Sequence, residues 1–390
     1  MSRRGAPHSM APGWRCCCGR CSPRCWPCLA GSTGGGSSGD ETPLYAIFSW
    51  LKLAEYFLLY MVVTDSVRAP RDLRLVTWTL VAVGVGASVY PHTPTGRAQA
   101  AAMMTFKAVT PYDAEPNTLG TFLVLTVGVA AALYDGADKQ RTAQGLLCVM
   151  GLFLYTTATT YSRGAYGTVG VALLVVALFG GRRVRRFTFL MVPVALYVML
   201  PSLPEFMKEH AVGGLAALPK SKVYDRSWAG RQKQWAERMA EWRQHPVEGV
   251  GMGVKLMRSI DNDFVRALYE TGIVGLGLLL WLHWRVMKML LHAHRSLAAW
   301  EQQVSLGVLA GYLGVVVHGV SGCPFMIIRV AEPLWARVGA VAGMVALRQE
   351  EARAVLAGEA PALQVSEPAD SRVGPRTHGA DLLPRPACNT

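Results

Sequence analysis

The sequence lacks the patterns of several common protein classes. It has no alternation of lipid-facing and inward-facing residues, which a transmembrane β-barrel would require. Its amino-terminal stretch has no apolar core of roughly 7 to 15 residues, so no secretory signal peptide is predicted. Only 17% of its 390 residues are charged, whereas 51% are hydrophobic. These hydrophobic residues gather in long runs.

Cysteine is too unevenly distributed for a disulfide framework. Six of the nine cysteines lie near the amino end: Cys16, Cys17, Cys18, Cys21, Cys25 and Cys28. They include two C-x-x-C pairs, but far fewer residues separate the pairs than the roughly 15 to 20 of a zinc ribbon. We therefore expect no metal site and no cofactor.

The long apolar runs indicate a membrane protein. Between residues 44 and 347 the chain consists mainly of apolar segments of about 16 to 23 residues, the length that about 30 Å of hydrocarbon requires. Lipid offers no partner to an unpaired backbone amide, so we predict an all-α, polytopic transmembrane helical bundle. We expect about nine spans, roughly at 44–63, 73–90, 117–134, 143–160, 165–181, 187–203, 264–284, 303–319 and 324–347.

The net charge of +13 reflects basic loops rather than a nucleic-acid surface. Arginine and lysine concentrate in alternate short loops, for example at Arg68, Arg71 and Arg74 and again at Arg182, Arg183, Arg185 and Arg186. Such loops belong in the cytoplasm. The intervening loops, including Thr160 to Arg163 and the long loop 204–262, are then predicted to face outward.

The two ends of the chain differ from its middle. Nine spans in this orientation place the amino terminus outside, although five arginines and no acidic residue precede Asp40. We expect residues 1–43 to be disordered, or to reflect a misassigned start that replaces upstream spans. The transmembrane domain is predicted at 44–348, and residues 349–390 are predicted to form a disordered cytoplasmic tail.

The long outer loop contains an amphipathic segment. At 100° per residue, Trp228, Trp235, Met239 and Trp242 share one stripe, which predicts a helix lying at the membrane interface. Arg231 and Arg238 share one edge of that stripe, where guanidinium groups can meet phosphate. The alternative is that both are ordinary snorkelling arginines.

The next span begins with polar residues. Asn262, Arg266 and Glu270 recur at four-residue spacing and therefore share one face of a helix. Ionisable groups at the mouth of a span usually face the bundle or a water-filled cavity. Arg266 and Glu270 could equally form a structural pair.

Four stretches together resemble the bacterial O-antigen polymerase and O-antigen ligase-like integral membrane proteins. They are "EPNTLGTFL" (115–123), "TYSRGAYG" (160–167), "GRQKQW" through "HPVEGVG" (230–251) and "DNDFVRALYETGIVGL" (261–276). Their order and loop spacing match over roughly residues 70 to 345. The resemblance implies a GT-C-like glycosyltransferase that moves a glycan from undecaprenyl diphosphate to an acceptor sugar. The reaction would occur on the outer face of the bacterial cytoplasmic membrane without a metal ion.

A diphosphate leaving group needs fixed cations where negative charge develops. Within the resemblance, we expect Arg163 and Arg231 to hold the diphosphate, with Arg238 and Arg266 as weaker candidates. The alternative for Arg163 is an interfacial anchor.

Candidates for the remaining roles are less sharply defined. Asp261 is the first choice for the general base, with Glu270 and His245 as alternatives. Asp261 could instead cap the following helix. The residues expected to contact the acceptor or the glycan are Glu115, Asn262 and Trp235.

The ligase branch of the family typically carries a histidine before the asparagine, where this chain has Asp261. This departure favours a polymerase that joins lipid-linked repeat units into cell-surface polysaccharide. A ligase that passes finished glycan to a lipid or protein acceptor is the alternative, and a transporter or flippase of a lipid-linked glycan is the second. The expected partners are the undecaprenyl-diphosphate-linked glycan, membrane lipid and other polysaccharide-assembly proteins, and not nucleic acid.

Overall fold

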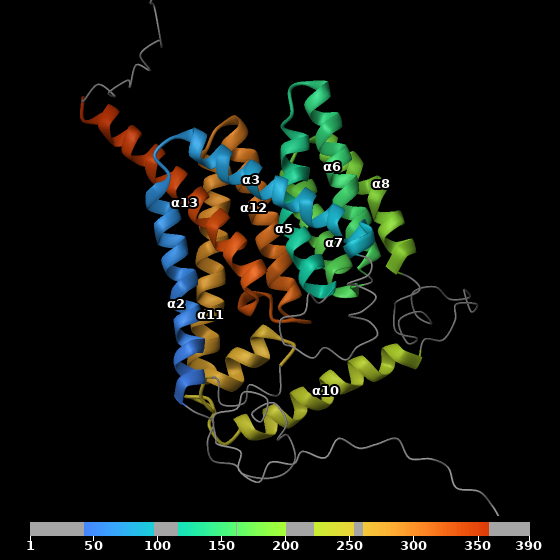
Figure 1. Cartoon of the computed structure of the whole chain (residues 1–390). Helices are drawn as coiled ribbons and strands as arrows, with labels where there is room; N and C mark the ends of the chain where they lie inside the picture. The colour runs from blue at the N-terminus through green and yellow to red at the C-terminus, as the bar shows by residue number, and fades with distance from the viewer. Residues whose placement is uncertain (1–42, 97–115, 161, 200–221, 253–259, 359–390) are drawn as a thin grey trace, which may run out of the picture.

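The computed structural model describes residues 43–96, 116–160, 162–199, 222–252 and 260–358. Within these ranges the chain is helical and contains no strand. Long helices pack lengthwise into a bundle, and one further helix lies across an end of it (Figure 1). The glycan contact predicted at Glu115 and the segment 1–42 lie outside the described residues.

Each predicted span coincides with a helix. These helices are α2 (Pro43–Ser66), α3 (Pro70–Val89), α5 (Pro116–Asp135), α6 (Gln140–Thr159), α7 (Arg163–Phe179), α8 (Arg182–Met199), α11 (Asp263–Ser296), α12 (Ala299–His318) and α13 (Ile328–Leu356). Six of the described helices, α2, α3, α5, α6, α11 and α13, are long and apolar enough to cross a membrane, and α7 is a shorter apolar helix. The predicted all-α polytopic bundle is confirmed, but α8 and α12 are not among the helices apolar enough to cross, so the expected count of about nine spans is not reached within the described residues.

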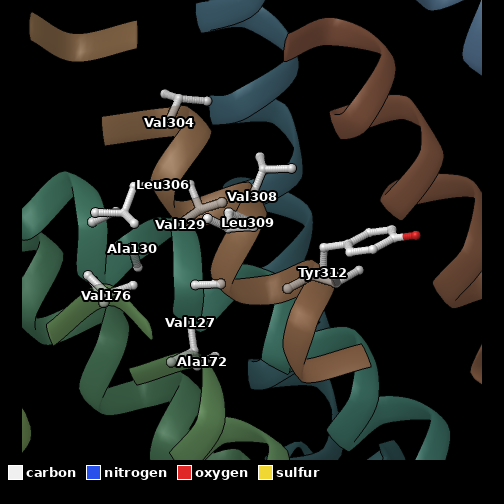
Figure 2. Close-up of a cluster of buried hydrophobic side chains, with 14 of the residues drawn as sticks. Val127, Val129, Ala130, Ala172, Val176, Val304, Leu306, Val308, Leu309 and Tyr312 are labelled. Carbon is white, nitrogen blue, oxygen red and sulfur yellow. The ribbon is translucent and has the colours of Figure 1, made fainter. Parts of the chain in front are cut away.

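The core lies where α5 packs against α12 and α7. Valine and alanine of α5 and α7 meet the apolar side chains of α12, as Figure 2 shows around Val127, Ala172 and Leu309. Glycine on α12 permits this close approach, because a Cβ added to Gly307 would come 2.5 Å from the Val129 Cα. About 78% of the apolar stretch of α5 is buried, against 11% for α2 and for α11. These two helices therefore form the periphery.

The peripheral helix α2 is attached to the bundle through α13. Small residues Gly339 and Gly343 of α13 face α2, and the Thr64 hydroxyl donates a hydrogen bond to the Gly339 carbonyl at 3.2 Å. Close packing of this small-xxx-small type is a common way to join helices in lipid. α13 runs obliquely across the bundle (Figure 1) and packs against both α2 and α11.

The two ends of the bundle differ in character. The amphipathic helix predicted in the long loop exists as α10 (Lys222–Trp242) and lies across one end, here called the α10 end. The short 3₁₀ helix η3 (Pro324–Met326) and the first residues of α7 and α11 lie at the same end. The short loops at 66–70, 135–140, 180–182 and 296–299, which contain or adjoin basic residues such as Arg68, Arg141, Arg182 and Arg295, lie at the opposite end, as alternating loops require.

The structure differs from the predictions at the end of α13 and within α11. α13 continues to Leu356, so the tail predicted to be disordered from residue 349 begins as helix. α11 is bent at Gly272, where the backbone has φ 67° and ψ −167°. A second 3₁₀ helix, η1 (Tyr90–His92), extends α3.

Candidate functional site

Asn262 organises the start of α11. Its Oδ1 accepts hydrogen bonds from the Phe264 and Val265 N–H groups at 2.9 and 3.0 Å, which is an N-cap. Its Nδ2 donates to the Val320 carbonyl at 2.9 Å, and the residue is buried. The capping role considered for Asp261 therefore belongs to its neighbour. The side-chain amide predicted to contact glycan is engaged within the protein.

The turn between α12 and η3 is fastened to this helix start. The Asp263 N–H donates to the Gly319 carbonyl at 2.8 Å, and the Phe325 N–H donates to Asp263 Oδ2 at 3.3 Å. The Cys323 thiol donates to the Ile260 carbonyl at 2.7 Å. Burial raises the pKa of this thiol, which keeps it protonated as a donor. The site therefore rests on a rigid junction.

The bend at Gly272 receives the segment that follows α10. The Val250 and Gly251 N–H groups donate to the Tyr269 and Glu270 carbonyls at 2.9 and 3.0 Å, and the Ile273 N–H donates to the Pro246 carbonyl at 3.0 Å. The bend would otherwise leave these backbone groups of α11 without partners. The motif "HPVEGVG" thus supplies the hydrogen-bond partners that α11 lacks at its bend, and it holds the end of α10 beside α11.

Arg231 and Asp261 form the most accessible arginine–carboxylate pair of the site. Arg231 Nε lies 3.4 Å from Asp261 Oδ2, and their side chains are 25% and 44% exposed. A pair this exposed holds its two groups weakly, so either can turn to a ligand. The structure thus brings together the arginine predicted to bind diphosphate and the aspartate predicted as general base.

Arg238 has a different environment from the one predicted. Its side chain is 5% exposed, its Nη1 lies 3.3 Å from Glu241 Oε2, and its guanidinium lies 5.3 Å from the centre of the Tyr269 ring. The Tyr269 hydroxyl donates to the same Glu241 oxygen at 2.9 Å. Arg238 therefore joins α10 to α11 and is buried, whereas the sequence suggested a guanidinium available to phosphate.

Arg266 and Glu270 form the structural pair that was the alternative reading of this motif. Arg266 Nε lies 3.0 Å from Glu270 Oε1, and their side chains are 21% and 15% exposed. Lys52 of α2 lies within electrostatic reach of Arg266. Glu55 and Glu332 also lie within electrostatic reach of Lys52, so charges of both signs extend from α11 toward α2 and α13.

The other predicted residues are placed as follows. His245 lies on an exposed turn, with Nδ1 3.0 Å from Glu248 Oε1, and this contact helps to lower the pKa of Glu248 below its usual value. Trp235 is half-buried on α10, between Arg231 and Arg238 in the sequence. Arg163 is the first residue of α7, behind the Ser162 cap, and its side chain lies outside the described part of the structure.

His318 is a candidate that the sequence reasoning missed. It ends α12 at the α10 end, is buried, and lies within electrostatic reach of Arg231. A Cβ added to Gly164 would come 2.9 Å from its Cε1, and one added to Gly322 would come 3.3 Å from its Nε2. The imidazole thus lies between the start of α7 and the turn after α12. A histidine at the mouth of a span was the signal that could have identified it.

A cavity of about 620 Å³ opens beside these charges, between α2, α11, η3 and α13. Its walls are mainly apolar and aromatic, and include Trp50, Phe57, Leu279, Trp281, Phe325 and Trp335. Asp263 and Arg266 line it toward the α10 end, and Met289 lines it far along α11. From Thr271 to Met289 the helix rises about 27 Å. We call this cavity the groove.

Comparison with known families identifies part of the chain. Residues 148–280 match the family model described as O-antigen ligase. This segment is O-antigen ligase-like. No curated protein matches the chain.

The O-antigen ligase-like segment contains three of the four stretches on which the resemblance was based, and "EPNTLGTFL" lies before it. It runs from α6 to the middle of α11 and so includes Arg163, Arg231, Asp261 and the bend at Gly272. His318 and the α13 wall of the groove lie beyond it. The family supports a membrane protein of the O-antigen ligase or polymerase type, whose reaction is glycan transfer. Among the described residues, no three or more His, Cys, Asp and Glu side chains are grouped to share a metal ion.

Proposed function

We propose that this protein is a membrane glycosyltransferase that polymerises oligosaccharide repeat units carried on undecaprenyl diphosphate. The observation that carries the proposal is the partly exposed Arg231–Asp261 pair, which joins α10 to the residues just before α11. A cation for a departing diphosphate and a carboxylate for an attacking hydroxyl are thereby in contact before substrate arrives. The α10 end would face the extracytoplasmic side of the bacterial cytoplasmic membrane.

The chemistry requires one bond to form and one to break. The acceptor hydroxyl oxygen forms a bond to the anomeric carbon of the donor glycan, and the bond from that carbon to the diphosphate oxygen breaks. The hydroxyl proton passes to the Asp261 carboxylate, and undecaprenyl diphosphate leaves with the bonding electrons. Arg231, with Arg163 from the start of α7, would stabilise the negative charge on the leaving group.

Arg238 and Arg266 differ from Arg231 because both are more deeply buried in their ion pairs. Arg238 and Arg266 each have a close carboxylate partner, and Arg238 is also packed on Tyr269. Moving Arg266 to a phosphate would leave the largely buried Glu270 carboxylate unpaired, at a cost of a few kcal/mol, and moving Arg238 would withdraw it from its buried place on the Tyr269 ring. We therefore propose that these two position α10 and α11, and that Arg231 and Arg163 contact the diphosphate directly.

The groove supports a lipid-linked donor. It is mainly apolar and meets charged residues, among them Arg266, toward the α10 end, which would suit an amphiphile with a hydrocarbon chain and a polar head. A transporter would instead place its polar site near the bilayer midplane between repeats. The charged residues of the candidate site gather at the α10 end, which favours transfer over transport.

The first experiment is reconstitution of the purified full chain in liposomes with an undecaprenyl-diphosphate-linked repeat unit, followed by gel separation of the products. A ladder of lengthening glycan without another acceptor is expected. Product that forms only when a separate lipid or protein acceptor is added would establish the ligase alternative. Absence of transfer under both conditions would contradict glycan transfer and favour a transporter or flippase.

The role of Arg231 is tested by a matched pair of variants. Arg231→Ala should lower turnover by roughly 10²-fold, the usual effect of removing one group that stabilises developing negative charge. Arg243→Ala, an exposed arginine just beyond α10, should retain full turnover. Equal rates for the two variants would remove Arg231 from the site.

A further inference from the structure

Arg337 of α13 is buried in the bundle, and its two terminal nitrogens find no hydrogen-bond partner among the described residues. The residue is 4% exposed. Both terminal nitrogens, Nη1 and Nη2, are buried without a hydrogen-bond acceptor in the described part of the chain. Its position is about 14 Å along α13 from Ile328, well inside the apolar part of the helix. This differs from Arg348 on the same helix, which has two carboxylate partners, Glu301 and Glu351.

An unpaired guanidinium is costly in this position. Arginine is not deprotonated in proteins, so it cannot reduce the cost by losing its charge. A lone charge inside a membrane bundle costs at least about 2.5 kcal/mol, and such residues normally pair with another group or face a cavity. Within the described residues the salt bridges do not include Arg337.

The guanidinium lines a small separate cavity. The cavity has a volume of about 10 Å³ and lies between α3, α5, α12 and α13. Its other walls are Leu73, Val76, Thr77, Val129, Val304, Val308 and Ala340. Thr77 is the one further polar side chain among these lining residues, and its hydroxyl donates to the Leu73 carbonyl at 2.7 Å. The wall therefore supplies no negative charge.

We infer that this cavity binds one small monatomic anion, such as chloride, which bridges the two terminal nitrogens of Arg337. The volume is at the lower limit for one water-sized particle, so it excludes phosphate and sulfate, and a halide, which is larger than water, enters only if the apolar side chains of the wall shift slightly. A water molecule could satisfy the N–H groups but would leave the charge uncompensated. The anion would hold α13 against α3, α5 and α12, and this role is independent of glycan transfer.

The test is the thermal stability of the purified full chain in detergent at constant ionic strength. Potassium chloride and potassium bromide should raise the unfolding midpoint by a few degrees relative to potassium gluconate, with saturation as the site fills. Arg337→Met should abolish this dependence on halide. Arg348→Met, which removes an arginine with its own carboxylate partners, should retain it.

A second measurement on the unaltered chain covers the case in which Arg337→Met does not fold. Crystals grown in bromide should show one anomalous scattering peak beside the Arg337 guanidinium. If the midpoint of the unaltered chain does not respond to halide, or if no bromide lies beside Arg337, the cavity holds water or nothing and the inference fails. An equal halide response in Arg337→Met would place the anion elsewhere and would also overturn it.

Discussion

At the scale of single residues, two neighbours in "DNDF" have opposite tasks. Asn262 directs its side chain into the protein, where it caps α11 and binds the turn after α12. Asp261 directs its carboxylate toward Arg231 at the surface of the site. Stability and chemistry are therefore separated between adjacent positions, and they can be measured separately.

Replacement of each residue by alanine should give opposite effects. Asn262→Ala should lower the free energy of unfolding by about 1 kcal/mol or more, because it removes an N-cap and the bond to Val320. Asp261→Ala should leave the unfolding midpoint almost unchanged and lower turnover by roughly 10²-fold or more. Thermal unfolding in detergent and the liposome assay measure the two effects. A large loss of stability in Asp261→Ala would show that the aspartate is structural.

The sequence indicated that arginines and carboxylates gather at this site, but it did not indicate every pair that they form. Helical spacing was sufficient to pair Arg266 with Glu270, because both lie on α11. The contact between Arg231 and Asp261 joins residues thirty positions apart and depends on how α10 docks. Arg238 was misplaced for the same reason: periodicity defines a stripe but does not reveal that Tyr269 covers its edge.

At the scale of elements, the bend of α11 couples the loop after α10 to the helix. Gly272 adopts a positive φ, which side-chain-bearing residues rarely adopt. A Cβ at this position would also collide with the backbone of Val247. The bend exposes the Tyr269 and Glu270 carbonyls, which Val250 and Gly251 then satisfy. One glycine therefore determines how α10 is presented to α11.

Alanine at two glycines of α11 tests this coupling. Gly272→Ala should destabilise the protein by more than about 1 kcal/mol and increase proteolysis within residues 246–251, because the loop can no longer dock. Gly277→Ala is the control: an added Cβ there meets nothing within 4 Å, so helix propensity alone should make it neutral or stabilising. Equal proteolysis of the two variants would mean that the bend does not hold the loop.

The elements themselves were largely predictable, because lipid thickness determines how long an apolar run must be. Each expected span matches a helix to within a few residues at most ends. The bend was not predicted, since a glycine before an apolar run is also compatible with a straight helix. The bend is stabilised by backbone hydrogen bonds to residues 246–251. The periodicity of apolar residues carries no information about such backbone contacts.

At the scale of the whole molecule, the groove is formed by segments from both halves of the chain. α2 contributes Trp50 and Phe57, α11 contributes Leu279 and Trp281, and α13 contributes Trp335. α2, α11 and α13 line this one cavity, and α13 packs against both of the other helices. The apolar pattern of one helix cannot indicate such a space, because each helix that lines the groove has the sequence of an ordinary lipid-facing span. The sequence therefore predicted the charged end of the site and not the apolar groove beside it.

If the groove holds the hydrocarbon chain of the donor, filling it should affect long-chain donors alone. Leu279→Trp places a large side chain on the groove wall, and Leu280→Trp places the same side chain on an adjacent outward-facing position. With an undecaprenyl-linked donor, Leu279→Trp should raise KM at least tenfold and Leu280→Trp should not. With a donor carrying a short isoprenoid chain, both variants should match the unaltered protein, because the short chain ends before the obstruction.

The pattern of rates separates this prediction from the broader proposal. If the unaltered protein transfers glycan from neither donor, glycan transfer itself is contradicted and the groove is not tested by activity. If Leu279→Trp slows both donors equally, the substitution disturbs the site rather than the chain, and if it slows neither, the chain lies outside the groove. A loss confined to the long-chain donor requires the obstruction and the hydrocarbon to compete for one space, because the charged groups at the α10 end are the same in both reactions.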